Sequence, residues 1–140
     1  MHRNSQRRRN VALWVVQGLL AALFLVAGGM KLITPTEVLS LMSPFPGAFI
    51  KVIGACEVLG ALGLVLPWAL GIRRALTPLA AAGLAIIMVG ATVSTLAIGG
   101  GVLALADVVI GVLAAAVVHG RREALGVRRP TAPRLRPAAA

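Results

Sequence analysis

Residues 11–30 read VALWVVQGLLAALFLVAGGM and contain no charged side chain. About 20 consecutive apolar residues are enough to cross the hydrocarbon core of a bilayer as a helix. Further apolar stretches follow at residues 52–72, 75–106 and 107–120. Their only acidic or basic side chains are Glu57, Asp107 and His119. The chain is therefore predicted to be an integral membrane protein.

The composition supports a membrane protein and excludes several other classes. Hydrophobic residues make up 59% of the 140 residues, which is more apolar surface than a soluble domain of this size could cover. The net charge of +10 is also typical of nucleic-acid-binding proteins. Here the arginines flank the apolar stretches, so we interpret them as membrane anchors and expect no nucleic-acid partner. The single cysteine, Cys56, excludes an intramolecular disulfide and Cys-x-x-Cys redox chemistry.

The N-terminal segment resembles a secretion signal, because Arg7-Arg8-Arg9 precede an apolar run. The run is longer than the 7–15 residues of a usual signal core, and no small-residue cleavage site follows it. Lys31 ends it instead. We therefore expect the segment to be retained as the first membrane span.

The chain divides into a basic arm at residues 1–10, a transmembrane domain at 11–120, and a basic, mostly disordered tail at 121–140 that is rich in Arg, Pro and Ala. We predict spans at about 11–31, 49–68, 75–98 and 102–119. The proline-rich loop after the first span is expected to hold a short interfacial helix at Pro35–Met42, with Thr34 as its N-cap.

The distribution of arginine predicts the orientation. All twelve arginines fall before the first span, between the second and third spans, or after the fourth. The positive-inside rule then places both termini in the cytoplasm, with an even number of spans between them. The predicted fold is an all-α, up-down-up-down four-helix bundle in the inner (plasma) membrane.

The same topology brings polar residues from all four spans to the outer half of the membrane. Lys31 ends the first span, Glu57 lies roughly 12 Å deep in the second, and Asp107 roughly 8 Å deep in the fourth. The third span adds Ser94 and Thr95 to this half. Ionisable residues inside a membrane are costly and normally face the bundle interior with a partner. We therefore expect these five residues to gather there.

Helical periodicity predicts that the polar residues share faces with small residues, which allow close packing in lipid. The predicted faces are Gln17, Ala21, Phe24, Gly28 and Lys31 in the first span; Gly54, Glu57, Gly60, Ala61 and Leu64 in the second; Gly83, Ile87, Gly90 and Ser94 in the third; and Asp107, Gly111 and Ala115 in the fourth. Gln17 lies in the inner half, where we expect it to make an interhelical hydrogen bond.

Two interpretations of the Lys31, Glu57 and Asp107 group remain open. In the first, Lys31 neutralises one of the carboxylates and the group only orients the helices. In the second, the group and the hydroxyls of Ser94 and Thr95 line a cavity that binds a quinone, a polar head group or a proton. The sequence contains no phosphate loop, zinc motif or nucleophile triad, so it assigns no catalytic residue and no metal ligand. Whether the protein is an enzyme stays open.

Three segments resemble the DoxX-like family of small bacterial membrane proteins. They are FLVAGGMKL at residues 24–32 with Pro35 after it, IGACEVLGALGLVLP at 53–67 with its Gly-x-x-Glu-x-x-Gly core, and LTPLAA at 76–81. The resemblance implies a four-span bundle in which Lys31 and Glu57 occupy family positions. Many members carry a polar or His residue near the end of the third span. This chain has Val93-Ser94-Thr95 there, and the absence of a His weakens an enzymatic interpretation.

Distant relatives of that family include a membrane subunit of thiosulfate:quinone oxidoreductase. The resemblance therefore implies a redox-associated membrane subunit that binds a quinone or a similar small hydrophobic ligand. The alternative is a non-enzymatic accessory protein that supports a membrane protein partner. A small transporter, which would need a homo-oligomer to form a pathway, is less favoured because the chain shows no inverted repeat.

Overall fold

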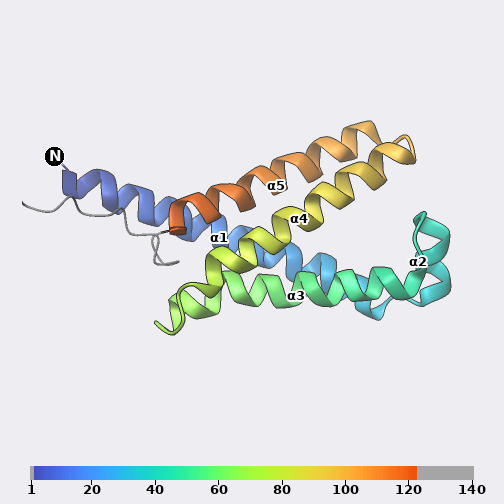
Figure 1. Cartoon of the computed structure of the whole chain (residues 1–140), viewed down its shortest axis with the longest axis horizontal. Coiled ribbons are helices and arrows are strands. Elements are labelled where there is room, and N and C mark those ends of the chain that lie inside the picture. Colours follow the sequence, from blue (N-terminus) through green and yellow to red (C-terminus); the bar gives the residue numbers. More distant parts are fainter. Residues whose placement is uncertain (1, 123–140) are drawn as a thin grey trace, which may run out of the picture.

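The computed structural model describes the backbone of residues 2–122 and the side chains of residues 6–122. This part of the chain is helical and contains no strand. The helices are α1 (His2–Ile33), α2 (Thr36–Met42), α3 (Gly47–Ala69), α4 (Leu76–Ala97) and α5 (Gly101–Arg121), shown in Figure 1. All except α2 are long and apolar enough to cross a membrane. The predicted all-α fold with four spans is confirmed.

Some helix ends differ from the prediction. α1 continues back through the basic residues to His2, and α5 begins at Gly101, one residue before the predicted fourth span. The interfacial helix α2 is present, but Thr34 is not its N-cap. The Thr34 hydroxyl donates to the carbonyl of Met30 at 2.7 Å, and Pro35 takes the cap position. The predicted tail lies outside the described residues, except for Arg121 and Arg122.

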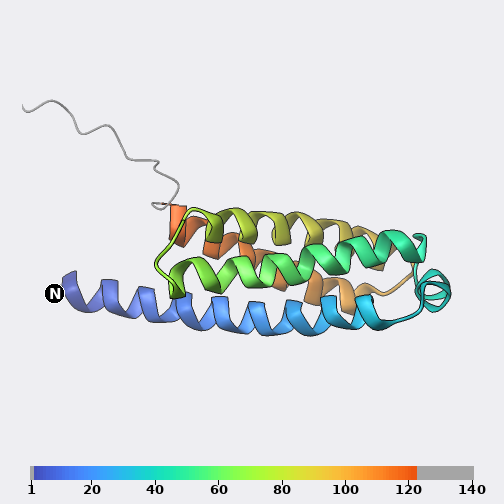
Figure 2. The ribbon, with the colours of Figure 1, turned by 90° about the horizontal axis from the view of Figure 1, so that it is seen from below.

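The four long helices form two antiparallel hairpins. α1 packs along α3, α4 packs along α5, and α3 and α4 join the two hairpins. The hairpins meet where α1 passes Asn10 and Gln17, where α3 turns into α4 and where α5 ends, which we call the arginine end. The first turns of α1 extend beyond this end (Figure 2). They diverge toward the opposite end, the loop end, which carries α2 and the turn between α4 and α5 (Figure 1). Figure 2 shows that the long helices remain nearly parallel in the perpendicular view.

The shared apolar core follows from this divergence. Its buried residues come from all four long helices and are Leu20, Ala21, Phe24, Ala61, Leu64, Ala81, Leu84, Met88, Ala114 and Val117. On α4 and α5 they extend from the arginine end to about the middle of each helix. In the loop half of α5, Ala104 is the buried apolar residue. Large exposed side chains such as Val93 and Val102 cover the outer faces, as expected for helices surrounded by lipid.

Glycines set the close approach of α1 to α3. A Cβ added at Gly28 would lie 2.6 Å from the carbonyl oxygen of Gly54. A Cβ added at Gly54 would lie 2.8 Å from the Cβ of Lys31. Association of helices in lipid depends on van der Waals contact and hydrogen bonds, so small residues at the crossing strengthen it. This contact also holds Lys31 above the third helix, next to Glu57.

The predicted faces are confirmed for the first two spans and wrong for the third. Gln17, Phe24 and Glu57 are buried on the expected faces. On α4, Gly83 and Gly90 are exposed, and the buried face consists instead of Thr77, Pro78, Ala81, Leu84 and Met88. α4 packs through side chains larger than glycine, so its glycines do not mark the packed face. On α5 the prediction is wrong for Ala115, which is exposed, while Ala114 is buried.

The Gly28 contact leads to a prediction that uses its neighbour as a control. Gly28→Ala should lower the free energy of unfolding by about 1–3 kcal/mol, because the added methyl group overlaps the α3 backbone. Gly29 has no atom within 4 Å of an added Cβ. Gly29→Ala should be neutral, or stabilising by up to about 1 kcal/mol, because alanine is the better helix former. Denaturant unfolding in detergent measures both, and equal effects would contradict the close crossing.

Candidate functional site

An ion pair joins α1 and α3 near the loop end. Lys31 Nζ lies 2.7 Å from Oε2 and 2.9 Å from Oε1 of Glu57, so the ammonium donates to both carboxylate oxygens. The Glu57 side chain is 3% exposed and that of Lys31 is 30% exposed. A buried carboxylate is tolerated in a membrane helix when a partner offsets its charge. The Gly28–Gly54 crossing brings the two helices close enough for this pair to form.

A second polar contact joins α4 and α5. The hydroxyl of Thr95 donates to Oδ2 of Asp107 at 2.8 Å. The hydroxyl of Ser94 donates to the carbonyl of Gly90 in its own helix, also at 2.8 Å. Thr95, Asp107 and Ser94 therefore each have a hydrogen-bond partner within the α4–α5 hairpin.

The five predicted site residues therefore form two separate pairs plus Ser94. One pair belongs to the α1–α3 hairpin and the other to the α4–α5 hairpin. The two hairpins diverge toward the end where both pairs lie (Figure 1). The structure brings Lys31 to Glu57 and Asp107 to Thr95. The role of these five residues in binding a ligand stays a prediction.

α2 closes the loop end over the start of α3. The Ser40 hydroxyl accepts from the backbone N–H of Gly47 at 2.8 Å, and Lys51 Nζ donates to the carbonyl of Leu32 at 3.1 Å. The pKa of the exposed Glu37 lies below its usual value, because its backbone N–H and the Thr36 hydroxyl donate to the carboxylate. Lys51 contributes to the same lowering. These contacts order the loop without using the intramembrane ion pair.

Pro67 creates another polar contact between α3 and α4. Proline lacks an N–H, so the carbonyl of Gly63 loses its usual helical donor. The hydroxyl of Thr77 donates to this carbonyl at 3.1 Å. Gln17 Nε2 donates to the neighbouring carbonyl of Leu64 at 2.6 Å, which confirms the predicted interhelical hydrogen bond of Gln17.

Arg121 completes this network, and sequence analysis missed it by assigning Arg121 to the tail. Nε donates to Gln17 Oε1 at 2.9 Å, and Nη1 donates to Asn10 Oδ1 at 2.8 Å. The guanidinium carbon lies 3.9 Å from the centroid of the Trp68 ring. Arg121 is 4% exposed. A glutamine within a span needs polar partners. Gln17 was therefore the one feature of the sequence that indicated a polar side chain from another helix at this position.

The two ends of the bundle thus differ in chemistry. Near the loop end, each hairpin has one internal polar pair. At the arginine end, α1, α3 and α5 share a cationic network. Among the described residues, no group of three or more His, Cys, Asp or Glu side chains is arranged to hold a metal ion.

Comparison with known proteins gives one match. The sequence model of the DoxX-like family matches residues 15–117, which includes Lys31, Glu57 and Asp107. No curated protein and no solved structure matches the chain.

Double-mutant cycles test whether the two pairs are energetically independent of each other. We expect Lys31→Met and Glu57→Gln to be strongly coupled, by about 0.5–3 kcal/mol, because the residues are in contact. Lys31→Met and Asp107→Asn should be additive within about 0.5 kcal/mol. Unfolding free energies in detergent provide all the values. A Lys31–Asp107 coupling as large as the Lys31–Glu57 coupling would show one shared cluster instead of two pairs.

Proposed function

Because the chain belongs to the DoxX-like family and forms four apolar spans, we propose that it is a non-enzymatic accessory protein that supports a membrane protein partner. The observation that carries this proposal is the closed Lys31–Glu57 ion pair. Each group satisfies the other, which is the arrangement expected of a contact that orients helices. The proposal places the protein in the inner (plasma) membrane with both termini in the cytoplasm, following the arginine distribution.

The other polar side chains near the loop end support the same function. Asp107 accepts from Thr95, Ser94 donates to its own helix, and Lys51 donates to the carbonyl of Leu32. A general acid, general base or nucleophile needs a group within reach of a substrate. Asp107, Ser94 and Lys51 each make a contact within the chain, which favours a structural use of these three groups.

The outer faces of the helices offer a surface for a partner. Leu79, Ile86 and Val93 are exposed at seven-residue spacing along α4, so they share one face. Near Val93 the two hairpins diverge, and each helix there has fewer neighbours within its own chain (Figure 1). Helices that lack internal neighbours gain contact and hydrogen-bond energy by packing against spans of another protein. We expect the partner at this half.

A photo-crosslinking residue placed on α4 tests this expectation. Placed at Val93, it should form a crosslink to one protein of the same membrane, because Val93 lies where the hairpins diverge. Placed at Leu79, on the same face of α4 but near the arginine end, it should form that crosslink weakly. Both variants are irradiated in the intact membrane, and the crosslinked protein is identified by mass spectrometry. Equal crosslinking at both positions, or crosslinking to lipid alone, would contradict the proposed partner site.

A second candidate function is binding of a quinone or similar small amphiphile. The observation that favours it is that the Lys31 side chain is 30% exposed. Lys31 belongs to the α1–α3 hairpin, which diverges from the hairpin that carries Thr95 and Asp107. The ammonium could then donate to a quinone oxygen from its place above Glu57. In this case the Lys31–Glu57 pair would serve the ligand as well as the fold.

Replacing the whole ion pair separates the two functions. A buried pair can often be exchanged for apolar residues of similar size at little cost, whereas removal of one partner costs roughly 3–5 kcal/mol. Lys31 is partly exposed, so water offsets some of the cost of leaving it unpaired. We therefore expect Glu57→Leu to lower the free energy of unfolding by about 3 kcal/mol or less. The double variant Lys31→Met/Glu57→Leu should recover stability near that of the wild type. It should also retain the partner protein crosslinked from Val93.

The same preparations, extracted with their native lipid, are assayed for quinone by solvent extraction and mass spectrometry. If the protein is an accessory protein, neither the wild type nor the double variant should retain a fixed number of quinone molecules per chain. One quinone per wild-type chain, lost in a stable double variant, would contradict the accessory function and establish the second candidate. Glu37→Gln, which changes an exposed acid outside the spans, is the matched control.

A further inference from the structure

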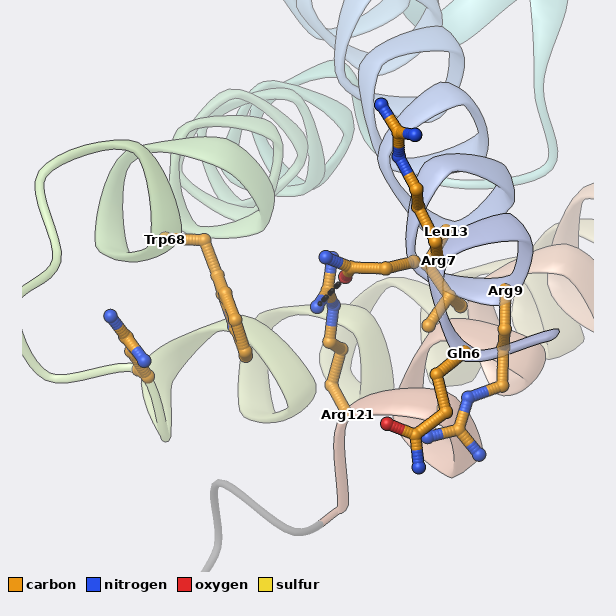
Figure 3. A pocket seen from close by; sticks show the side chains of 9 residues that line it. Gln6, Arg7, Arg9, Leu13, Trp68 and Arg121 are labelled. Atoms are coloured by element: carbon orange, nitrogen blue, oxygen red, sulfur yellow. Dashed lines mark hydrogen bonds between the residues drawn. The ribbon is translucent and has the colours of Figure 1, made fainter. Parts of the chain in front are cut away.

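The arginine end contains a cavity of about 670 Å³ that neither function uses. Four arginines line it, Arg7, Arg9, Arg74 and Arg121, together with Trp68. Figure 3 shows Arg121 between Trp68 and the side chains of α1. The guanidinium of Arg74 lies over the same Trp68 ring, 4.9 Å from its centroid. The cavity therefore concentrates positive charge beside an aromatic side chain.

The described residues supply no negative charge to balance these arginines. The acidic residues among them are Glu37, Glu57 and Asp107. Glu57 is paired with Lys31 and Asp107 with Thr95 near the loop end, and Glu37 belongs to α2. Arg7, Arg9 and Arg74 are exposed and Arg121 is buried, so the repulsion acts mainly on Arg121, where burial lowers the local dielectric. An anion in the cavity would remove this cost.

Arg121 points to where such an anion would bind. It is 4% exposed, and its Nε and Nη1 donate to Gln17 and Asn10. Its Nη2 is buried and has no acceptor among the described residues, and the same holds for Nε1 of Trp68. A buried donor left without an acceptor costs stability, so folded proteins rarely keep one. Both donors belong to side chains that line one cavity and stack on each other. Both nitrogen atoms are covered, so an anion in the cavity reaches them only after a side chain rotates.

We propose that this cavity binds the phosphodiester head group of an anionic phospholipid. Phosphate oxygens accept from the planar fork of an arginine, and the Trp68 N–H can donate to another oxygen of the same group. The volume lies within the range of small-ligand sites. The cavity lies at the ends of the spans, beside Trp68, where lipid head groups meet a membrane protein. A soluble phosphate compound shares the chemistry, but the phosphate of a lipid is already held at the level of the span ends.

Lipid retention tests the proposal with matched arginine variants. The protein is reconstituted in nanodiscs of equal phosphatidylglycerol and phosphatidylcholine, released in the mass spectrometer, and its bound lipids are counted. The wild type should retain phosphatidylglycerol over phosphatidylcholine by roughly tenfold, the effect of a charge-assisted hydrogen bond. Arg74→Gln should reduce this preference about fivefold, because it removes one direct ionic contact to the head group in the cavity. The neighbouring Arg73→Gln should leave it unchanged, because Arg73 does not line the cavity.

Arg121→Gln should abolish the preference, with Arg122→Gln as its control. If Arg121→Gln prevents folding, the Arg74 and Arg73 pair still decides the question. Equal retention of the two lipids by the wild type, or equal effects of Arg74→Gln and Arg73→Gln, would overturn the proposal. Inorganic phosphate is also added to the protein in pure phosphatidylcholine. If it raises the melting temperature as much as phosphatidylglycerol does, the assignment to lipid is overturned.

Glu123, outside the described residues, provides an internal control. We expect Glu123→Gln to leave phosphatidylglycerol retention unchanged. An increase would mean that its carboxylate competes for the cavity, and it would overturn the head group as the resident partner of Arg121.

Discussion

The absence of water from the bilayer core is the constraint on which this structure depends. A polar group inside the membrane must find its partner within the protein. Glu57 does so with Lys31, Asp107 with Thr95, and the carbonyl freed by Pro67 with Thr77. Each contact joins two helices, so satisfying the polar groups and assembling the bundle are the same event. The apolar faces add little orientation of their own, because lipid solvates them as well as protein does.

These contacts are unevenly distributed, and the shape of the protein follows from that. Near the loop end each polar pair stays within one hairpin, so it holds two helices together and leaves the other two free. At the arginine end, Gln17 and Arg121 connect α1, α3 and α5 in one network. The shared core lies in the same half. The protein is therefore two hairpins joined at one end and divergent at the other.

The sequence was sufficient to predict the spans and the packing of the first hairpin. Uncharged runs of about 20 residues specify membrane helices with little ambiguity. Glu57 and Lys31 each needed a partner, and glycines on the same faces indicated where α1 and α3 cross. On α4 the glycines at 83 and 90 were misleading, because in a lipid-facing helix a glycine can face outward at little cost. The relative placement of the two hairpins was not predictable, since the sequence does not show whether Asp107 accepts from a local hydroxyl or from a distant lysine. Arg121 was missed because charge patterns mark the ends of spans but do not show which arginine turns inward.

The central claim is that the hairpins are joined at the arginine end and diverge at the loop end. Pulsed electron paramagnetic resonance of spin-labelled protein in nanodiscs, in a Cys56→Ser background, tests it directly. One label pair at Ile33 and Ile98 spans the hairpins at the loop end, and a second pair at Leu70 and His119 spans them at the arginine end. The account predicts a clearly longer distance for the first pair than for the second. Equal distances at both ends, as in a bundle of uniformly packed helices about 8–10 Å apart, would contradict it.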